Sequence, residues 1–312
     1  MKKNWNINRT DTLSGKTVIV TGANTGLGYE TARALALRGA SVVLACRDQA
    51  KAETAASEIA AEKASAHVET SLLNLASLDS VRAFADRFKA KHNRLDILVN
   101  NAGVMMPPKS VTEDGFELQW GVNHLGHFLL TSLLFPVLSA TKNSRVVHLA
   151  SLAHKWGEIY FEDLNFEKKY NKSKAYGQSK LACLMFGYEM QRRLEKSGSH
   201  VKSLIAHPGI SDTELSRYLP KWVTALSPLF TLFFAQSARA GAEPQLRAAT
   251  DADLKGGEYL GPSGFGEYKG KPVIVDSTDL SKDKAVAKKL WEVSEKAVGA
   301  EFAIGQAAVA EG

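Results

Sequence analysis

The sequence predicts a doubly wound α/β fold of the Rossmann type, and three observations carry that prediction. Short apolar segments rich in β-branched residues alternate with longer amphipathic segments over most of the 312 residues. The apolar segments read as near-continuous runs, which is typical of parallel strands covered by helices on both faces and joined by right-handed crossovers. No internal repeat or low-complexity linker divides the chain. We therefore expect a single domain over residues 15–297, between an arm (1–14) and a tail (298–312).

The expected elements follow one another in a regular rhythm. A β-branched run at 17–21 is the first strand, and the helical pattern behind it stops at Gly39, a residue suited to a C-terminal cap. Further strands are expected at 41–46, 66–73, 95–100, 145–150 and 201–207. Further helices are expected at 49–63, 77–92, 122–138 and 176–194.

Two long connections, 152–175 and 210–236, interrupt this rhythm. Both follow the carboxyl ends of strands, which is where open α/β sheets bind their ligands. The second connection is rich in leucine and aromatic residues, so it is either an amphipathic lid over an apolar substrate or part of the core or of a subunit contact. We favour the lid. The Ala- and Gly-rich residues after 298 are expected to be poorly ordered.

Composition and charge exclude several classes of protein. The net charge is +6 and the pI is near 9.1, but basic and acidic residues are interspersed, so a nucleic acid is not expected as a partner. Cys46 and Cys183 are far apart and lie in apolar runs, which argues against a disulfide framework or a zinc site. His124 and His127 have helical spacing but no acidic or thiol companion at a ligand-like interval, so we interpret them as structural or surface residues. No metal site is predicted.

No integral membrane segment is expected. The first fifteen residues are polar and lack the apolar core of a signal peptide, and the longest apolar run, 222–235, is too short to span a bilayer. Together with the cysteine usage, this pattern predicts a protein of the reducing cytoplasm.

The first turn of the predicted sheet carries a candidate phosphate site. The run Thr21-Gly22-Ala23-Asn24-Thr25-Gly26-Leu27-Gly28 lies between the first strand and the first helix. Backbone N–H groups and the helix dipole accept a phosphate at such a place, and glycines let the backbone approach a pyrophosphate closely. The spacing is G-x-x-x-G-x-G, and its position between a strand and a helix favours a dinucleotide.

The end of the second strand bears on the choice of dinucleotide. An acidic residue there would hold the ribose 2′-hydroxyl of NAD, whereas an arginine can bind the 2′-phosphate of NADP. Arg47 follows the strand directly, so NADP is favoured. Asp48, one place further on, is the argument for NAD, and Arg47 could also be a solvated strand-end residue.

Tyr176 and Lys180 are the candidate proton-transfer pair. Their four-residue spacing places them one turn apart on the same side of a helix. At roughly 5 Å and an effective dielectric near 20, the ammonium would favour the tyrosinate by about 3 kcal/mol. That makes Tyr176 a proton donor usable near neutral pH. Taken alone, such a pair on an amphipathic helix is more often a half-buried ring and a solvated charge.

In order and context, these features resemble the motifs of the short-chain dehydrogenase/reductase family over about residues 14–297. The residues that fill these motifs resemble those of the retinol dehydrogenase and protochlorophyllide reductase branch, as does the long interval between Ser151 and Tyr176. The motifs that carry the resemblance are Thr21 to Gly28, Ala45-Cys46-Arg47-Asp48, Asn100-Asn101-Ala102-Gly103, Val122-Asn123-His124-Leu125-Gly126-His127-Phe128, Ser151, Tyr176 with Lys180, His207-Pro208-Gly209 and Leu290-Trp291-Glu292-Val293-Ser294.

The resemblance implies a role for each catalytic candidate. Tyr176 would protonate a carbonyl oxygen or deprotonate an alcohol, and Ser151 would position the same oxygen. Lys180 would favour the tyrosinate and hold the nicotinamide ribose, and Asn123 would anchor a water that links Lys180 to solvent.

The resemblance also implies a cofactor cradle beyond the glycine-rich turn. Asn101, Ala102 and Gly103 would lie beside the adenosine half of NADP. Asn74 and Leu75 stand where the family has an aspartate that receives the adenine amino group, and an asparagine carbonyl can accept the same hydrogen bond. The nicotinamide end would be bordered by Pro208, Gly209 and Thr213.

The sequence therefore predicts an NADP-dependent oxidoreductase that acts on an apolar ketone, aldehyde or alcohol. Two alternatives are a light-dependent reductase of a protochlorophyllide-type C=C bond and a catalytically silent dinucleotide-binding regulator. The helices expected at 122–138 and 176–194 could form a homodimer face, as they do in relatives, unless a C-terminal extension covers it.

Overall fold

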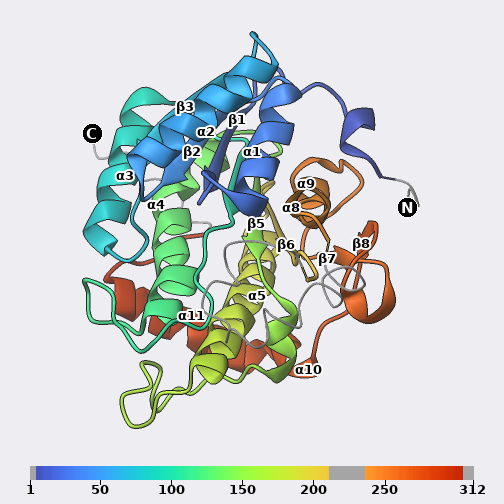
Figure 1. The fold of residues 1–312 in the computed structure, drawn as a ribbon. Helices are drawn as coiled ribbons and strands as arrows, with labels where there is room; N and C mark the ends of the chain where they lie inside the picture. Colours follow the sequence, from blue (N-terminus) through green and yellow to red (C-terminus); the bar gives the residue numbers. More distant parts are fainter. Residues whose placement is uncertain (1–4, 211–235, 305–312) are drawn as a thin grey trace.

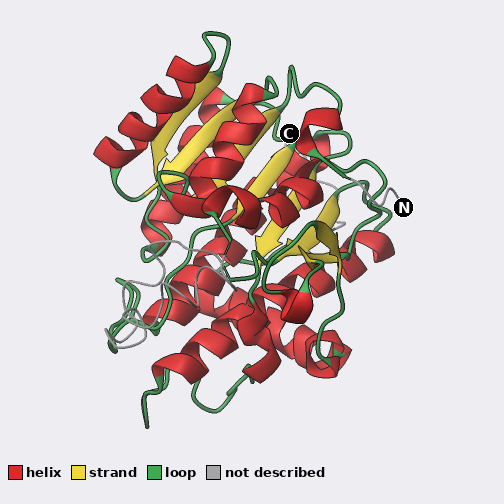
Figure 2. Cartoon of the chain, turned by 45° about the vertical axis from the view of Figure 1, so that its right-hand side comes forward, coloured by secondary structure: helices red, strands yellow, loops and turns green. Residues whose placement is uncertain are grey.

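The computed structural model describes residues 5–210 and 236–304. Its centre is an eight-stranded sheet with the order β3-β2-β1-β4-β5-β6-β7-β8, in which only the last pairing, β7 with β8, is antiparallel. Helices cover both faces of the sheet (Figure 1 and Figure 2). The prediction of a doubly wound Rossmann-type fold is confirmed.

The six strands expected from the sequence are present, with ends that differ by no more than two residues. The structure adds two short strands near the C-terminus. The strands are β1 Thr17–Thr21, β2 Ser41–Cys46, β3 His67–Leu72, β4 Ile97–Asn100, β5 Arg145–Leu149, β6 Lys202–Ala206, β7 Tyr259–Pro262 and β8 Pro272–Ile274.

The helices agree with the expected rhythm up to β6, and those beyond it were not expected. The α-helices are α1 Gly26–Leu37, α2 Gln49–Glu62, α3 Leu78–Lys91, α4 Gly126–Ala140, α5 Lys172–Lys196, α8 Ala238–Gly241, α9 Glu243–Thr250, α10 Asp279–Lys282 and α11 Lys284–Val298. The 3₁₀ turns are η1 Ile7–Arg9, η3 Leu152–Trp156 and η5 Phe265–Glu267, and η2 Trp120–Leu125 is a π-helical turn.

Alternation along the central strands builds two hydrophobic layers, because successive side chains of a strand point to opposite faces. Ile19, Leu98 and Val146 face a layer that includes side chains of α3, α4, α5 and α11. Their neighbours Val20 and Val99 face the other layer, with α1, α2 and α9. The sheet is thus held between helices, and its carboxyl edge is the place left for a ligand.

Helix α5 begins at Lys172, four residues before the start expected at 176. Its N-cap is Asn171, whose side-chain oxygen accepts hydrogen bonds from the N–H groups of Ser173 and Lys174, both at 3.0 Å. Asparagine is a preferred N-cap residue, so this earlier start is readable from the sequence. As a result, Tyr176 lies inside a formed helix, where its direction is fixed.

The long helix expected at 122–138 is instead the π-helical turn η2 followed directly by α4. By length and composition, Trp120–Ala140 could cross a membrane, and among the described residues it is the one stretch with that property. Its mean hydropathy is 1.3, and 78% of the apolar window is buried inside the protein. This is the setting of a core helix.

The C-terminal helix α11 runs across α4 and α5 (Figure 1). Trp291 of α11 makes edge contacts with Phe128 of α4, and Phe302 stacks on Trp291 with ring centroids 4.9 Å apart. Phe302 is 3% exposed, so the expectation of a poorly ordered tail after 298 is wrong for this residue. A C-terminal extension thus packs on the α4 and α5 face, and the homodimer stays a prediction.

Replacing Trp291 by alanine should lower the free energy of unfolding by about 3–5 kcal/mol, measured by urea denaturation. The indole is 2% exposed, and the Arg193 guanidinium lies 4.2 Å from its ring. Trp291→Phe is the matched control. It keeps an aromatic ring and removes an indole N–H that has no partner among the described residues, so its cost should stay below about 1.5 kcal/mol. Equal losses in the two variants would contradict this packing account.

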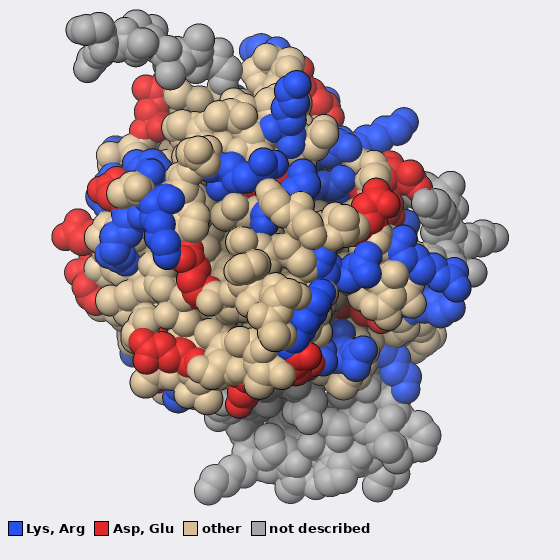
Figure 3. Space-filling view, turned by 90° about the horizontal axis from the view of Figure 1, so that it is seen from above, with Lys and Arg blue, Asp and Glu red and all other residues tan. Residues whose placement is uncertain are grey.

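On the face shown in Figure 3, basic and acidic side chains lie interspersed with uncharged surface. This agrees with the scattered charge pattern of the sequence.

Candidate active site

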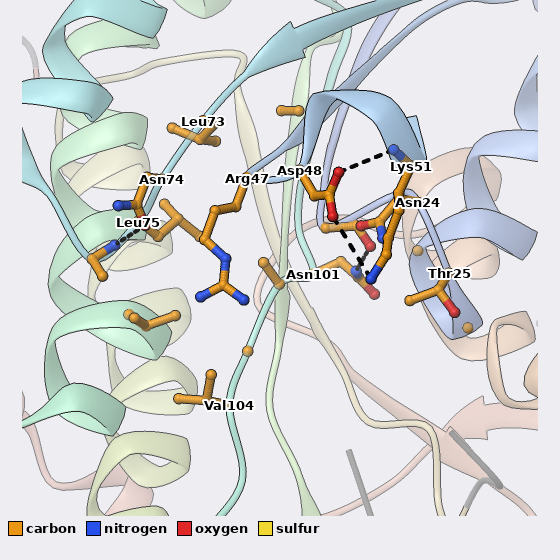
Figure 4. A pocket seen from close by; sticks show the side chains of 18 of the residues that line it. Asn24, Thr25, Arg47, Asp48, Lys51, Leu73, Asn74, Leu75, Asn101 and Val104 are labelled. Atoms are coloured by element: carbon orange, nitrogen blue, oxygen red, sulfur yellow. Dashed lines mark hydrogen bonds and ion pairs between the residues drawn. The ribbon is translucent and has the colours of Figure 1, made fainter. Parts of the chain in front are cut away.

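A cavity of about 660 Å³ opens at the carboxyl ends of β1, β2 and β4 and reaches the last residue of β5 (Figure 4). It brings together twelve of the residues predicted to bind the cofactor: Gly22, Asn24, Thr25, Gly26, Leu27, Gly28, Arg47, Asn74, Leu75, Asn101, Ala102 and Gly103. Sequence reasoning missed other lining residues, among them Lys51 and Val104.

The glycine-rich turn has a geometry that larger residues would disturb. Gly22 and Gly26 have φ values of 63° and 57°, in the left-handed region that favours glycine. A Cβ on Gly28 would overlap the carbonyl oxygen of Gly22 and the side-chain amide of Asn101. The three glycines therefore let the turn and the start of α1 close up against the end of β4.

The N-terminus of α1 is suited to a phosphate. Thr25 is its N-cap residue and makes no side-chain capping hydrogen bond. The N–H groups of the first helical turn therefore keep their donors available on the cavity side, at the positive end of the helix dipole. This uncapped terminus beside a glycine turn fits the pyrophosphate of a dinucleotide.

Asn101 and Thr21 join the two turns that form the cavity floor. The hydroxyl oxygen of Thr21 accepts hydrogen bonds from the N–H groups of Asn101 and Ala102, both at 2.9 Å. The Asn101 side chain donates to the carbonyl of Thr21 at 2.7 Å. Gln245 of α9, which sequence reasoning missed, donates to the carbonyl of Leu27 at 3.2 Å. These side chains shape the cradle through backbone groups.

At the end of β2, the side chain of Asp48 is engaged with Lys51, whereas that of Arg47 is available to a ligand. The carboxylate of Asp48 caps α2 by accepting from the N–H of Lys51 at 3.1 Å, and it lies 3.7 Å from the ammonium of the same residue. Arg47 is exposed and makes no hydrogen bond or ion pair with the described residues. Figure 4 shows its guanidinium extending into the cavity, between Leu75 on one side and Asp48 with Lys51 on the other.

Asn74 lines the cavity, but its side chain is already engaged. Its Oδ1 accepts from the N–H of Ala76 at 3.1 Å, and its Nδ2 donates to Glu113 at 3.0 Å. A carbonyl oxygen has a second lone pair, and that is the acceptor left for the expected adenine contact.

Lys180 stands at the wall of the same cavity. Its ammonium donates to the carbonyl of Leu149, the last residue of β5 and a lining residue, at 2.9 Å. It also lies 3.6 Å from the position that a Cβ on Gly103 would take. Lys180 is 5% exposed and Tyr176, one turn earlier on α5, is 6% exposed. The predicted proton-transfer pair is therefore shielded from bulk solvent beside one end of the cavity.

Ser151 lies two residues after the end of β5 and is the N-cap residue of η3, with its side-chain oxygen accepting from the N–H of Ala153 at 3.2 Å. The segment behind it packs tightly on α5, because Gly157 lies against Gly177, the residue after Tyr176. A Cβ on Gly157 would overlap the carbonyl oxygen of Gly177. This close approach anchors the segment that carries Ser151 to the helix that carries Tyr176 and Lys180.

Asn123 lies in the π-helical turn, and both its side-chain amide and its main-chain carbonyl have protein partners. Its side chain accepts from the N–H of Val104 at 2.8 Å and donates to the carbonyl of Val104 at 3.0 Å and to Ser179 at 2.9 Å. Its carbonyl accepts from His127 at 3.0 Å and from the thiol of Cys183 at 3.1 Å. Asn123 thus clamps the cavity wall, and its role as a water anchor stays a prediction.

The histidines of this region are buried and structural, which is one of the two interpretations that the sequence allows. Burial lowers the pKa of His127 to about 4 and that of His124 to about 3. His127 links the carbonyl of Asn123 to the hydroxyl of Thr21, and His124 lies 2.7 Å from the hydroxyl of Ser294. Neutral rings at these positions tie the helices to the sheet.

The remaining cofactor candidates lie outside the cavity lining. Pro208 and Gly209 follow β6, and Gly209 has a left-handed φ of 68°. Thr213 lies outside the described residues, as does most of the lid predicted at 210–236.

Comparison with known proteins bears on this site. A family model for short chain dehydrogenases matches residues 16–224. The chain belongs to the short-chain dehydrogenase family. Members of this family bind a nicotinamide dinucleotide, and this short-chain dehydrogenase is accordingly an oxidoreductase acting on a small molecule.

Similar proteins place this short-chain dehydrogenase in the retinol dehydrogenase-like branch. Human retinol dehydrogenase 13 is 46% identical to it over 298 residues, with 93% of this chain and 86% of that protein covered. Mouse retinol dehydrogenase 12 is 46% identical over 292 residues, with 93% and 88% covered. A crystal structure of an uncharacterized Mycobacterium paratuberculosis protein, 40% identical, superposes with a TM-score of 0.79 over 96% of this chain and 99% of that one.

Proposed function

We propose that this short-chain dehydrogenase uses NADP to interconvert an apolar ketone or aldehyde with its alcohol, with Tyr176 as the general acid and base. One observation carries the proposal. A single cavity extends from the glycine-rich turn and Arg47 to Gly103 and Leu149, where the Lys180 ammonium lies. A dinucleotide held at the turn would therefore reach the buried proton-transfer pair with its other end.

The nicotinamide, when bound, supplies or accepts a hydride. The hydroxyl of Ser151 would hydrogen-bond the substrate oxygen and hold it near the phenol of Tyr176. Tyr176 would donate its proton to that oxygen in reduction and recover it in oxidation. The Lys180 ammonium lies one turn further along α5, and burial of the pair would keep water from competing for the proton.

The preference for NADP rests on the charges at the end of β2. Asp48 is occupied by helix capping and by Lys51, so its carboxylate is poorly placed to select a ribose hydroxyl. Arg47, whose guanidinium extends into the cavity, is suited to a bidentate contact with a 2′-phosphate (Figure 4).

Arg47→Ala should lower kcat/KM for NADPH by roughly 10- to 100-fold and leave kcat/KM for NADH nearly unchanged, because a charge-assisted hydrogen bond to the phosphate is lost. Steady-state rates with the two cofactors measure this ratio. Arg47→Lys, which keeps the charge without the planar fork, should fall between the wild type and the alanine variant. An unchanged ratio in Arg47→Ala would remove Arg47 as the selecting residue.

A carbonyl and alcohol panel followed by NADPH absorbance tests the activity itself. The retinol dehydrogenases among its relatives make retinal and retinol the first pair to include, with smaller apolar aldehydes, ketones and a sugar acid as the polar comparison. Turnover of apolar members in the dark supports the proposal. Light-dependent loss of protochlorophyllide would favour the C=C reductase instead, and binding of NADPH without turnover of any compound would favour a regulator.

A further inference from the structure

Glu267 links two segments that flank the predicted chemistry. It lies in the connection between β7 and β8, beyond the part of the chain that the family model matches. Its Oε1 accepts a hydrogen bond from the ammonium of Lys155 in η3, at 3.1 Å, and η3 follows Ser151 directly. Its Oε2 lies 2.9 Å from Nε2 of His207, which follows β6.

The partners of His207 define its protonation state. The N–H of Gly209 donates to Nδ1 of His207 at 3.2 Å, so Nδ1 is an acceptor and carries no proton. Nε2 then carries the proton and donates it to Glu267. The ring is fully buried, and Gly261 of β7 leaves room for it, because a Cβ there would overlap Nε2. His207 is therefore a neutral bridge from Glu267 to the main chain of Gly209.

The connection that carries Glu267 is held in an unusual backbone conformation. Glu267 has a φ of 59°, in the left-handed region, and so has Gly266 before it. Non-glycine residues in this region cost free energy and persist where the surroundings demand them. Here the carbonyl of Tyr268, the next residue, accepts a hydrogen bond from the N–H of Ile210 at 2.8 Å. The connection and the segment after β6 thus fix each other at two points.

We propose that Glu267 and His207 are positioning residues that hold the main chain of Gly209 at the nicotinamide end of the cofactor site, and that they do so only while His207 is neutral. The proposal rests on the proposed function, because it takes Pro208 and Gly209 to border the nicotinamide. Protonation at Nδ1 would leave the N–H of Gly209 without its acceptor. The new Nδ1–H of His207 and the N–H of Gly209 would then face each other as two donors. Acid should therefore weaken cofactor binding through this segment.

The groups around His207 determine the pH at which it becomes protonated. It is faced by Glu267 and Lys155, by the ring of Tyr259 at 5.1 Å between centroids, and by His154, which also packs on Tyr259. Burial lowers the pKa of His207 below its usual 6.5, while the carboxylate of Glu267 acts in the opposite direction. Removing that charge should lower the pKa further, so the loss of binding should move to more acidic pH.

The experiment measures the Kd of NADP⁺ by equilibrium titration from about pH 7.5 down to about pH 5. The oxidised cofactor is used because it is chemically stable in acid. The 2′-phosphate titrates in the same range in every variant, so the differences between variants are what count. Glu267→Gln should bind NADP⁺ within about threefold of the wild type near neutrality and shift the acid weakening to lower pH. Glu267→Ala should raise the Kd about tenfold near neutrality. His207→Asn, which keeps an acceptor for Gly209 and cannot be protonated, should show only the weakening due to the phosphate.

Lys155→Met is the control within the network. It removes the half-exposed partner of Glu267 and should leave the Kd near that of the wild type, since an exposed ion pair contributes little. Equal increases in Kd for all three Glu267 and His207 variants, with no change in pH dependence, would overturn the proposal in favour of a purely structural network. If the wild type turns over NADPH and the Glu267 and His207 variants keep the wild-type Kd and pH dependence, the positioning proposal alone is overturned. A wild-type protein that binds no NADP⁺ would overturn the proposed function as well.

Discussion

Replacing Tyr176 by phenylalanine should lower kcat about 10³-fold while the Kd for NADPH changes less than about twofold. The hydroxyl is the only part removed, and it would act on the substrate oxygen in the transition state. The ring keeps its place on α5, where it is buried next to the contact between Gly157 and Gly177. Single-turnover rates, together with cofactor titration by fluorescence, separate the two effects.

Tyr188→Phe is the matched control on the same helix. Its hydroxyl lies 2.9 Å from the hydroxyl of Ser277, away from the cavity, so its loss should reduce stability by about 1 kcal/mol and leave kcat unaltered. Full activity in Tyr176→Phe would rule out Tyr176 as the proton donor. A parallel loss of cofactor binding would show that the ring supports the cavity itself.

Gly28→Ala should abolish detectable cofactor binding and lower the free energy of unfolding by about 2–3 kcal/mol. The added methyl group meets a backbone carbonyl and the Asn101 amide, and neither has room to withdraw, because Asn101 holds the carbonyl of Thr21 at 2.7 Å. The turn must open, and the N–H groups at the start of α1 then lose their common direction. Isothermal titration with NADPH and urea unfolding measure the two losses.

Gly15→Ala distinguishes a clash from backbone strain. Gly15 has a φ of 76°, and a Cβ there would meet nothing within 4 Å. Its substitution should cost about 1–2 kcal/mol of stability through the left-handed backbone alone and leave cofactor affinity unaltered. Normal NADPH affinity in Gly28→Ala would show that the cradle tolerates a wider turn than the structure implies.

The parts of the fold that the sequence predicts well are those in which local pattern and tertiary role coincide. Apolar runs such as β1 and β2 are strands because both faces of the sheet are covered. The strands β7 and β8 escape detection because they have only four and three residues and contain glycine or proline. Helix α11 does carry a readable apolar stripe, with Ala287, Leu290, Trp291 and Val298 buried at helical spacing.

The site shows the same division. The glycine-rich turn, Arg47 and Gly103 are found from the sequence because their motifs are contiguous and their neighbours in the cavity follow from the order of the strands. The hydrogen-bond partners of Asn123 and Asn74 cannot be found from the sequence, since these side chains turn toward backbone groups that only the folded chain brings near. Gln245 and Glu267 lie in the C-terminal part, where no motif marks them.

The covering of α4 and α5 by α11 has a thermodynamic consequence. An apolar helix face that is closed by a second subunit is stable only above a certain protein concentration, because its burial follows mass action. Here the Phe128 and Phe186 rings are closed by Trp291 and Phe302 of the same chain. Burial of this face is therefore unimolecular, and dilution leaves it intact.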